Sequence, residues 1–158
     1  NAYTLADLNR RFDYLFKGGN HEIYPPVLKP HCVEDSQLGM EQVIGDISFI
    51  PFDQDHGTCK SLGFRFGDFG YSVDILDLDD AAIKTLQGIN IWMVDCAAYH
   101  NDDNAVHAGL NKIFALNKRI GAKQVYLSSL SLLMDYQTMI GELPQGYLPA
   151  YDGMKLSV

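Results

Sequence analysis

The chain has 158 residues, of which 47% are hydrophobic and 20% charged, as is typical of a soluble globular protein with one sizeable core. The 12 basic and 20 acidic residues give a net charge of −8, which excludes duplex nucleic acid and membranes as partners of the surface as a whole. A small anionic substrate stays possible, because one metal ion reverses the local field.

The three cysteines, Cys32, Cys59 and Cys96, are widely spaced and form no C-x-x-C pair. This pattern argues against a disulfide framework and favours a reducing compartment. No apolar run has transmembrane length and no signal-peptide pattern occurs at the N-terminus. We therefore expect a cytoplasmic protein with a single domain over residues 1–158.

The first third of the chain predicts a helix followed by short strands. Apolar residues recur on one face of residues 4–17, and Thr4 with Asp7 resembles a capping box. The Tyr24-Pro25-Pro26 stretch predicts an extended linker. Residues 27–33 and 40–44 are candidate strands.

Three strands are predicted next, over residues 47–52, 62–66 and 71–75, separated by turn signals around Gly57 and Gly67. Antiparallel neighbours run from edge to edge of a sheet, so the first and third strands end at the same edge. This brings His56 and Asp74 together, and an imidazole with a carboxylate is a plausible pair of metal ligands. The alternative is a turn histidine and a strand-end aspartate that never meet.

Helices and strands alternate in the second half, which predicts an α/β arrangement. Helices are expected over residues 80–87, with acidic residues at the start, over 104–120, and over 136–140 after Asp135. A strand that is buried on both faces is expected over residues 89–94. Another strand is expected over residues 124–130, and a terminal hairpin follows. The strand ends at Asp74, Asp95 and Ser128-Ser129 are where such a sheet places its chemistry.

Several short stretches resemble the second half of a metallo-β-lactamase-fold hydrolase, most of all the branch with the phosphoribosyl cyclic phosphodiesterases. The matching stretches are His56-Gly57, Leu62–Gly67, Tyr71–Asp74, Val94–Cys96, His107, Tyr126–Ser129, Leu143-Pro144 and Ala150–Met154. The resemblance implies part of an αββα sandwich, a mixed sheet with flanking helices. It also implies a two-metal site for zinc or manganese and a small phosphorylated or other anionic substrate.

The resemblance assigns roles to three residues of this chain. His56 matches a lone metal-binding histidine of the family, and Asp74 matches the aspartate that bridges the two metals. His107, expected at the start of a helix, matches a histidine that contacts the substrate phosphate or donates a proton to the leaving group. The remaining histidines, His21, His31 and His100, receive no role.

Two departures from the family pattern limit the expected activity. The family motif His-x-His-x-Asp-His does not occur, and a late metal-binding histidine of the family falls near Ser129. We therefore expect a fragment or a natural remnant that lacks most metal ligands and is inactive alone as a phosphodiesterase. The alternatives are a non-catalytic pseudoenzyme or interaction module of the same fold and an unrelated α/β binding protein. An uncovered apolar sheet face makes a homo-oligomer possible.

Overall fold

The computed structural model describes residues 2–19, 23–132 and 134–158, and it divides into two compact units, Asn1–Leu38 and Gly39–Val158. The first unit holds helices α1 (Ala2–Arg11) and α2 (Asp13–Lys17) and the 3-10 helix η1 (Asp35–Gln37). No helix in the described part of the chain is long and apolar enough to span a membrane. The single domain over residues 1–158 stays a prediction.

Three expectations for the first unit are wrong. The helix over residues 4–17 is interrupted at Phe12, whose φ of −133° lies outside the helical region. The capping box fails because α1 already begins at Ala2, and Asp7 instead forms ion pairs with Arg10 and Arg11. Residues 27–33 form no strand, since Pro30 lacks the N–H that a sheet partner needs.

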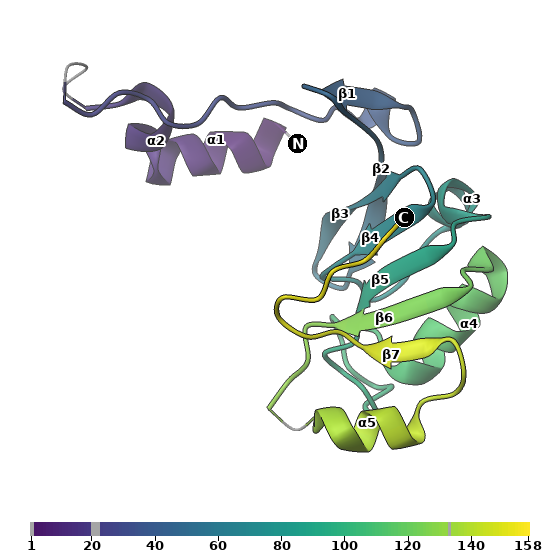
Figure 1. Ribbon diagram of the computed structural model, residues 1–158. Helices are drawn as coiled ribbons and strands as arrows, with labels where there is room; N and C mark the ends of the chain where they lie inside the picture. Colours follow the sequence, from purple (N-terminus) through teal and green to yellow (C-terminus); the bar gives the residue numbers. More distant parts are fainter. Residues whose placement is uncertain (1, 20–22, 133) are drawn as a thin grey trace. The chain divides into compact units, whose positions relative to one another are not determined.

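The second unit is built on one seven-stranded sheet whose strands follow chain order (Figure 1). The strands are β1 (Gln42–Ile44), β2 (Ile47–His56), β3 (Cys59–Phe66), β4 (Phe69–Ser72), β5 (Ile91–Asp95), β6 (Gln124–Ser128) and β7 (Tyr147–Pro149). Strands β1 to β4 pair antiparallel, and β4 to β7 pair parallel. The predicted α/β class, a mixed sheet with flanking helices, is confirmed.

The predicted terminal hairpin is wrong, because β7 runs parallel to β6. Parallel neighbours need a crossover connection that returns the chain to the starting edge. Helix α5 (Tyr136–Glu142) lies in that connection, and its start is capped by Asp135, whose carboxylate accepts the Thr138 N–H at 2.8 Å. This cap confirms the role predicted for Asp135.

Two further helices cover one face of the sheet. Helix α3 (Asp80–Leu86) is capped by Asp79, which accepts the Ala82 N–H, as its acidic start predicted. Helix α4 (Leu110–Ile120) begins later than the predicted Asn104. The Asn104 side chain accepts the N–H groups of Val106 and His107, and this holds residues 104–107 in a turn.

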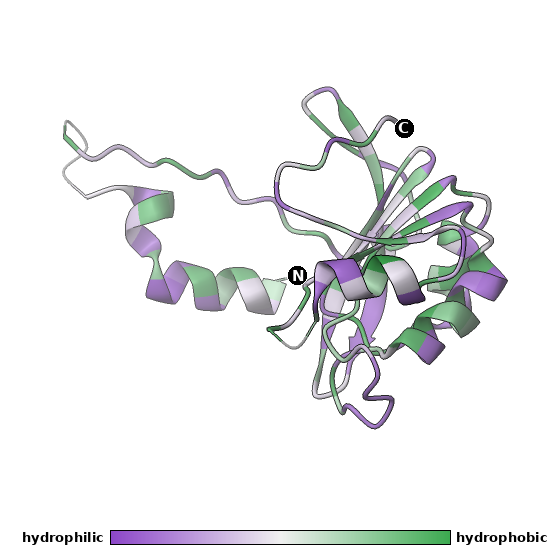
Figure 2. Cartoon of the chain, turned by 60° about the horizontal axis from the view of Figure 1, so that its bottom comes forward, coloured by the Kyte–Doolittle hydropathy of each residue, from purple (hydrophilic) through white to green (hydrophobic). Residues whose placement is uncertain are grey.

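The core lies between the sheet and these two helices. In Figure 1, α4 lies behind β6, and Figure 2 shows hydrophobic and hydrophilic residues mixed along the helices beside the sheet, as amphipathic helices require. The buried cluster includes Phe52, Trp92, Val94, Val125 and Leu127 from the strands, Ile83 and Leu86 from α3, and Ile113, Leu116 and Ile120 from α4.

The opposite face of the sheet carries a ladder of aromatic rings, which we call the aromatic face. It comprises Phe49, Phe64, Phe66, Phe69 and Tyr71, whose neighbouring ring centroids lie 5.8–6.5 Å apart. The sheet register continues the face from Tyr71 to Met93, Tyr126 and Leu148. Met93 is only half-buried, so the prediction that its strand is buried on both faces is wrong.

Strands β1 and β2 do not cover the aromatic face. Strand β1 pairs with β2, and β2 pairs with β3, so both extend the sheet at its edge. In Figure 1 the C-terminal segment after β7 passes in front of β4 and β5. Tyr71 and Leu148 nevertheless remain 37% and 40% exposed.

We predict that the chain self-associates at micromolar concentration through the aromatic face. Replacing Tyr71 and Leu148 together by lysine should yield a monomer with weaker binding of a hydrophobic dye, because association would bury two unpaired ammonium groups. Light scattering and sedimentation measure the change. Ile140→Lys, which adds charge at a 44% exposed position of α5, is the control. A strictly monomeric wild-type chain that binds no dye contradicts the prediction.

Candidate metal centre

Three side chains converge at the carboxyl edge of the sheet. His56 is the last residue of β2, Asp74 follows β4, and His107 lies in the loop between β5 and α4. One potential ligand atom from each lies within 4.8 Å of those of the other two. The expected convergence of His56 and Asp74 is therefore confirmed, and His107 joins them; their roles as ligands stay predictions.

The two imidazoles have fixed orientations because each Nδ1 faces an acceptor. Nδ1 of His56 lies 2.7 Å from the Val106 carbonyl oxygen, and Nδ1 of His107 lies 2.5 Å from Oδ2 of Asp95. A carbonyl and a carboxylate oxygen only accept, so each Nδ1 donates a proton, and Nε2 is the ring nitrogen left to bind a metal. This arrangement is usual for histidines that bind metals through Nε2.

Asp95 is the functional residue whose partner the sequence did not reveal. It is fully buried, and its other oxygen, Oδ1, accepts the Ala97 N–H at 2.8 Å. The available signal was its place at the end of a buried strand, since a carboxylate at that depth needs partners. The structure shows that His107 is this partner, and that His107 precedes α4 instead of starting it.

Three residues after the carboxyl ends of consecutive strands have unusual backbone angles. Asp74 follows β4 with φ 54°, Tyr99 follows β5 with φ 44°, and Ser129 follows β6 with φ 56°. They are the non-glycine residues with positive φ in the described part of the chain. Such angles disfavour L-residues and cluster at functional sites. Ser129 follows β6, whose last residue Ser128 pairs with Asp95, so it lies at the same edge of the sheet.

Gly57 allows the β2–β3 turn to lie against the loop that carries His107. Its φ is +70°, and a Cβ placed there would lie 2.1 Å from the Ala105 carbonyl oxygen. The hydrogen bond from His56 to Val106 depends on this approach, because Val106 is the next residue of that loop. Two segments distant in sequence are thereby joined at the candidate site.

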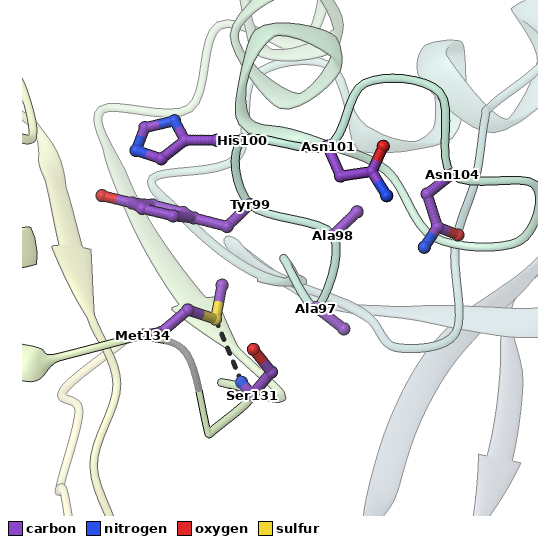
Figure 3. Close-up of a pocket in the computed structure, with 8 residues that line it drawn as sticks. All are labelled: Ala97, Ala98, Tyr99, His100, Asn101, Asn104, Ser131 and Met134. Carbon is purple, nitrogen blue, oxygen red and sulfur yellow. Dashed lines mark hydrogen bonds between the residues drawn. The ribbon is translucent and has the colours of Figure 1, made fainter.

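A pocket of about 450 Å³ lies next to this loop, between residues 97–104 and the segment after β6. It is lined by Ala97, Ala98, Tyr99, His100, Asn101, Asn104, Ser131 and Met134 (Figure 3). In Figure 3 Tyr99 and His100 lie on one side of it and Asn104 on the other. Asn104 also accepts the His107 N–H, so one wall of the pocket is continuous with the candidate metal centre.

The other candidate ligands lie outside the cluster. Burial and the Asp95 carboxylate raise the pKa of the Cys96 thiol to about 12, so it holds its proton at neutral pH. Cys59 is exposed and unpaired by any disulfide. Exposed His100 lies 3.6 Å from the Glu142 carboxylate. His21 lies outside the described residues.

The three residues fit one divalent cation. Two imidazole nitrogens and a carboxylate oxygen match catalytic zinc sites, which use three protein ligands and leave a position open. Asp74 is exposed, while His56 and His107 are half-buried, so the open side faces solvent. The outer partners of both imidazoles are already in place.

The sequence model of the beta-lactamase superfamily domain matches residues 1–128. The chain belongs to this superfamily. A search of curated proteins gives no match. The superfamily generally binds zinc or manganese, which agrees with the donor set of the cluster.

Solved structures of the superfamily share this fold. A diphosphatase from the PhnP family has 26% identity and a TM-score of 0.82 over 99% of this chain. The match covers 55% of that protein, so the chain spans about half its length. The fold is thus a metallo-β-lactamase fold of the PhnP-like branch, as the resemblance predicted.

Two more distant structures show the fold alone. The metallo-β-lactamase fold protein YhfI from Bacillus subtilis has 16% identity and a TM-score of 0.59, over 75% of this chain and 52% of its own. The short form of human tRNase Z (ELAC1) has 17% identity and a TM-score of 0.53, over 70% of this chain and 43% of its own.

We predict that Gly57→Ala breaks the link between His56 and the loop of His107. The added methyl clashes with the Ala105 carbonyl oxygen in addition to the strain of a positive φ. Gly67→Ala is the matched control, since its φ is +54° and its Cβ would meet nothing within 4 Å. We expect the control to lose about 1–2 kcal/mol of unfolding free energy, and Gly57→Ala clearly more, in denaturant titrations. Equal losses contradict the prediction.

Proposed function

We propose that this chain carries the second half of the active site of a metal-dependent hydrolase that cleaves a phosphodiester or diphosphate bond. The convergence of His56, Asp74 and His107 at one edge of the sheet carries the proposal. Membership of the superfamily and the similarity to a diphosphatase of the PhnP family support it. A bound divalent ion would supply Lewis-acid polarisation of a phosphoryl oxygen.

The residues of this chain have distinct parts in this proposal. His56 and Asp74 hold the ion, and Val106 and Asp95 keep the protons of the two imidazoles at Nδ1. Nε2 of His107 then completes a set of three ligands. The role implied by the family resemblance, contact with the phosphate or proton donation, is the alternative for His107.

The pocket beside His107 suits the organic part of such a substrate. The described residues that line it include no aspartate, glutamate, lysine or arginine. Two asparagine amides offer donors and acceptors, while the Tyr99 ring and the Met134 thioether offer apolar contact. Burial and the acceptor Glu142 raise the pKa of Tyr99 to about 12, which keeps its phenol protonated. An uncharged sugar or base fits this lining, and the phosphate belongs at the metal centre.

We predict that the full chain binds one Co²⁺ or Zn²⁺ ion. His56→Ala and Asp74→Ala should each weaken binding by more than about 100-fold, since loss of a direct ligand exceeds the effect of an outer partner. His100→Ala is the control, because this histidine lies outside the cluster. Calorimetry and the Co²⁺ absorption spectrum measure binding.

The same titration assigns the role of His107. If His107→Ala weakens binding as His56→Ala does, His107 is a ligand. If binding is unchanged, His107 is not a metal ligand and acts on the substrate instead. A wild-type chain that binds neither ion overturns the proposed metal centre.

A non-catalytic role is the second candidate, and Ser129 favours it. Its hydroxyl is a poor metal ligand compared with the imidazole of the family at this position. With the His-x-His-x-Asp-His motif also missing from the sequence, one three-ligand ion is the most that these residues support. The chain could then bind an anionic ligand without cleaving it.

We predict that the purified chain does not hydrolyse bis(p-nitrophenyl) phosphate above background, with zinc or manganese present. The candidate ligands complete at most one of the two metal sites of the family centre, and two-metal catalysis needs both. Turnover that a chelator removes and that Asp74→Ala abolishes would contradict this expectation. Spectrophotometric release of nitrophenolate is the measurement.

A further inference from the structure

A buried amide lies beneath the backbone of Asp74. Gln54, two residues before the end of β2, is only 1% exposed. Its Nε2 donates to the Val73 carbonyl oxygen at 2.9 Å and to Oγ of Ser61 at 2.9 Å. The Ser61 hydroxyl in turn donates a hydrogen bond to the Asp74 carbonyl oxygen at 2.6 Å.

These hydrogen bonds fix the two peptide groups on either side of the Asp74 Cα. The Val73 carbonyl belongs to the peptide before it, and the Asp74 carbonyl belongs to the peptide after it. Rotation about φ and ψ of Asp74 moves one of these groups relative to the other. Anchoring both therefore sets the left-handed backbone, φ 54°, from which the carboxylate reaches the two histidines.

The orientation of the Gln54 amide supports this role. Its Oε1 is buried and accepts no hydrogen bond from the described residues. A flipped amide would turn Oε1 towards the Val73 carbonyl oxygen, where two acceptors repel. In the observed orientation the amide oxygen is unpaired among the described residues, while the amide nitrogen donates both to Val73 and to Ser61.

Gly63 makes room for this amide. It lies opposite Phe52 on the neighbouring strand β3, and a Cβ there would lie 2.5 Å from Oε1 of Gln54 and 2.3 Å from the Phe52 ring. Glycine is therefore the residue that lets a long amide reach the end of β4 through the core.

We propose that Gln54 and Ser61 are positioning residues for Asp74. Ser61 donates to the carbonyl of Asp74, and Gln54 donates to the carbonyl before it and to Ser61. Together they hold the Asp74 carboxylate towards His56 and His107, so that the metal centre is preorganised. This inference rests on the proposed function, in which Asp74 is a metal ligand. Loss of such outer partners typically weakens metal binding by about 10- to 100-fold.

The test compares Co²⁺ affinity in the full chain with Gln54→Leu, Ser61→Ala and Ser61→Thr. We expect the first two variants to bind about tenfold more weakly and Ser61→Thr, which keeps the hydroxyl, to bind like wild type. Asn117→Leu is the matched control. Asn117 is also a buried amide, 9% exposed, with bonds to the Ala122 carbonyl and the Tyr147 hydroxyl. It should lose stability but not Co²⁺ affinity. If Gln54→Leu does not fold, half-buried Ser61 provides the test alone.

A second readout needs no metal. The HN–Hα coupling and chemical shifts of Asp74 report φ in the metal-free protein, and we expect the variants to leave the left-handed region. Wild-type affinity in Gln54→Leu and Ser61→Ala overturns the inference while leaving the proposed function intact. A wild-type chain that binds no Co²⁺ overturns the proposed function. In that case a positive φ retained in the variants overturns the inference as well, and its loss supports it.

Discussion

The antiparallel pairing of β3 with both β2 and β4 is the constraint on which the site depends. Because β3 reverses direction between them, β2 and β4 run parallel and end at the same edge. His56 and Asp74 therefore meet although β2 and β4 are not neighbours in the sheet. The parallel strands β5 and β6 end at this edge too, and they bring Asp95 and Ser129 to the same side. Strand direction alone thus gathers the polar residues of four strand ends.

The two faces of the sheet are filled in different ways. One face packs α3 and α4 against Phe52, Trp92 and branched residues of the strands, and a Cβ on Gly70 would already lie 2.7 Å from the Leu86 and Ile89 side chains. The other face presents aromatic rings at spacings typical of edge-to-face contacts. In the family sandwich a second sheet covers such a face. Close packing of α3 and α4 against the sheet holds the ends of the strands in place.

Local signals predicted much of this architecture. The caps Asp79 and Asp135 were readable because an acidic side chain before an apolar run has one dominant use. The start of α4 could not be predicted in this way. Asn104 is equally suited to capping a helix and to closing a turn, and its contact with His107 selects the turn. The direction of β7 was also hidden, because a short strand after a turn reads the same in either orientation.

The candidate site was predictable only in part for the same reason. His56 and Asp74 could be placed by strand direction, whereas the partner of Asp95 depends on how a loop folds back over the sheet edge. Gln54 gave no signal at all. A glutamine in a strand is ordinarily a surface residue, and its burial follows from the gap left by Gly63 on the neighbouring strand.

At the residues with left-handed backbone after β4, β5 and β6, the backbone conformation of the site is distinct from the chemistry of its side chains. Backbone angles at Asp74, Tyr99 and Ser129 follow from where each strand stops and from the carbonyls that are anchored around it. The side chain at such a position can change without moving its neighbours. Strand ends with the same left-handed backbone can therefore carry different side chains, as Asp74 after β4 and Ser129 after β6 do.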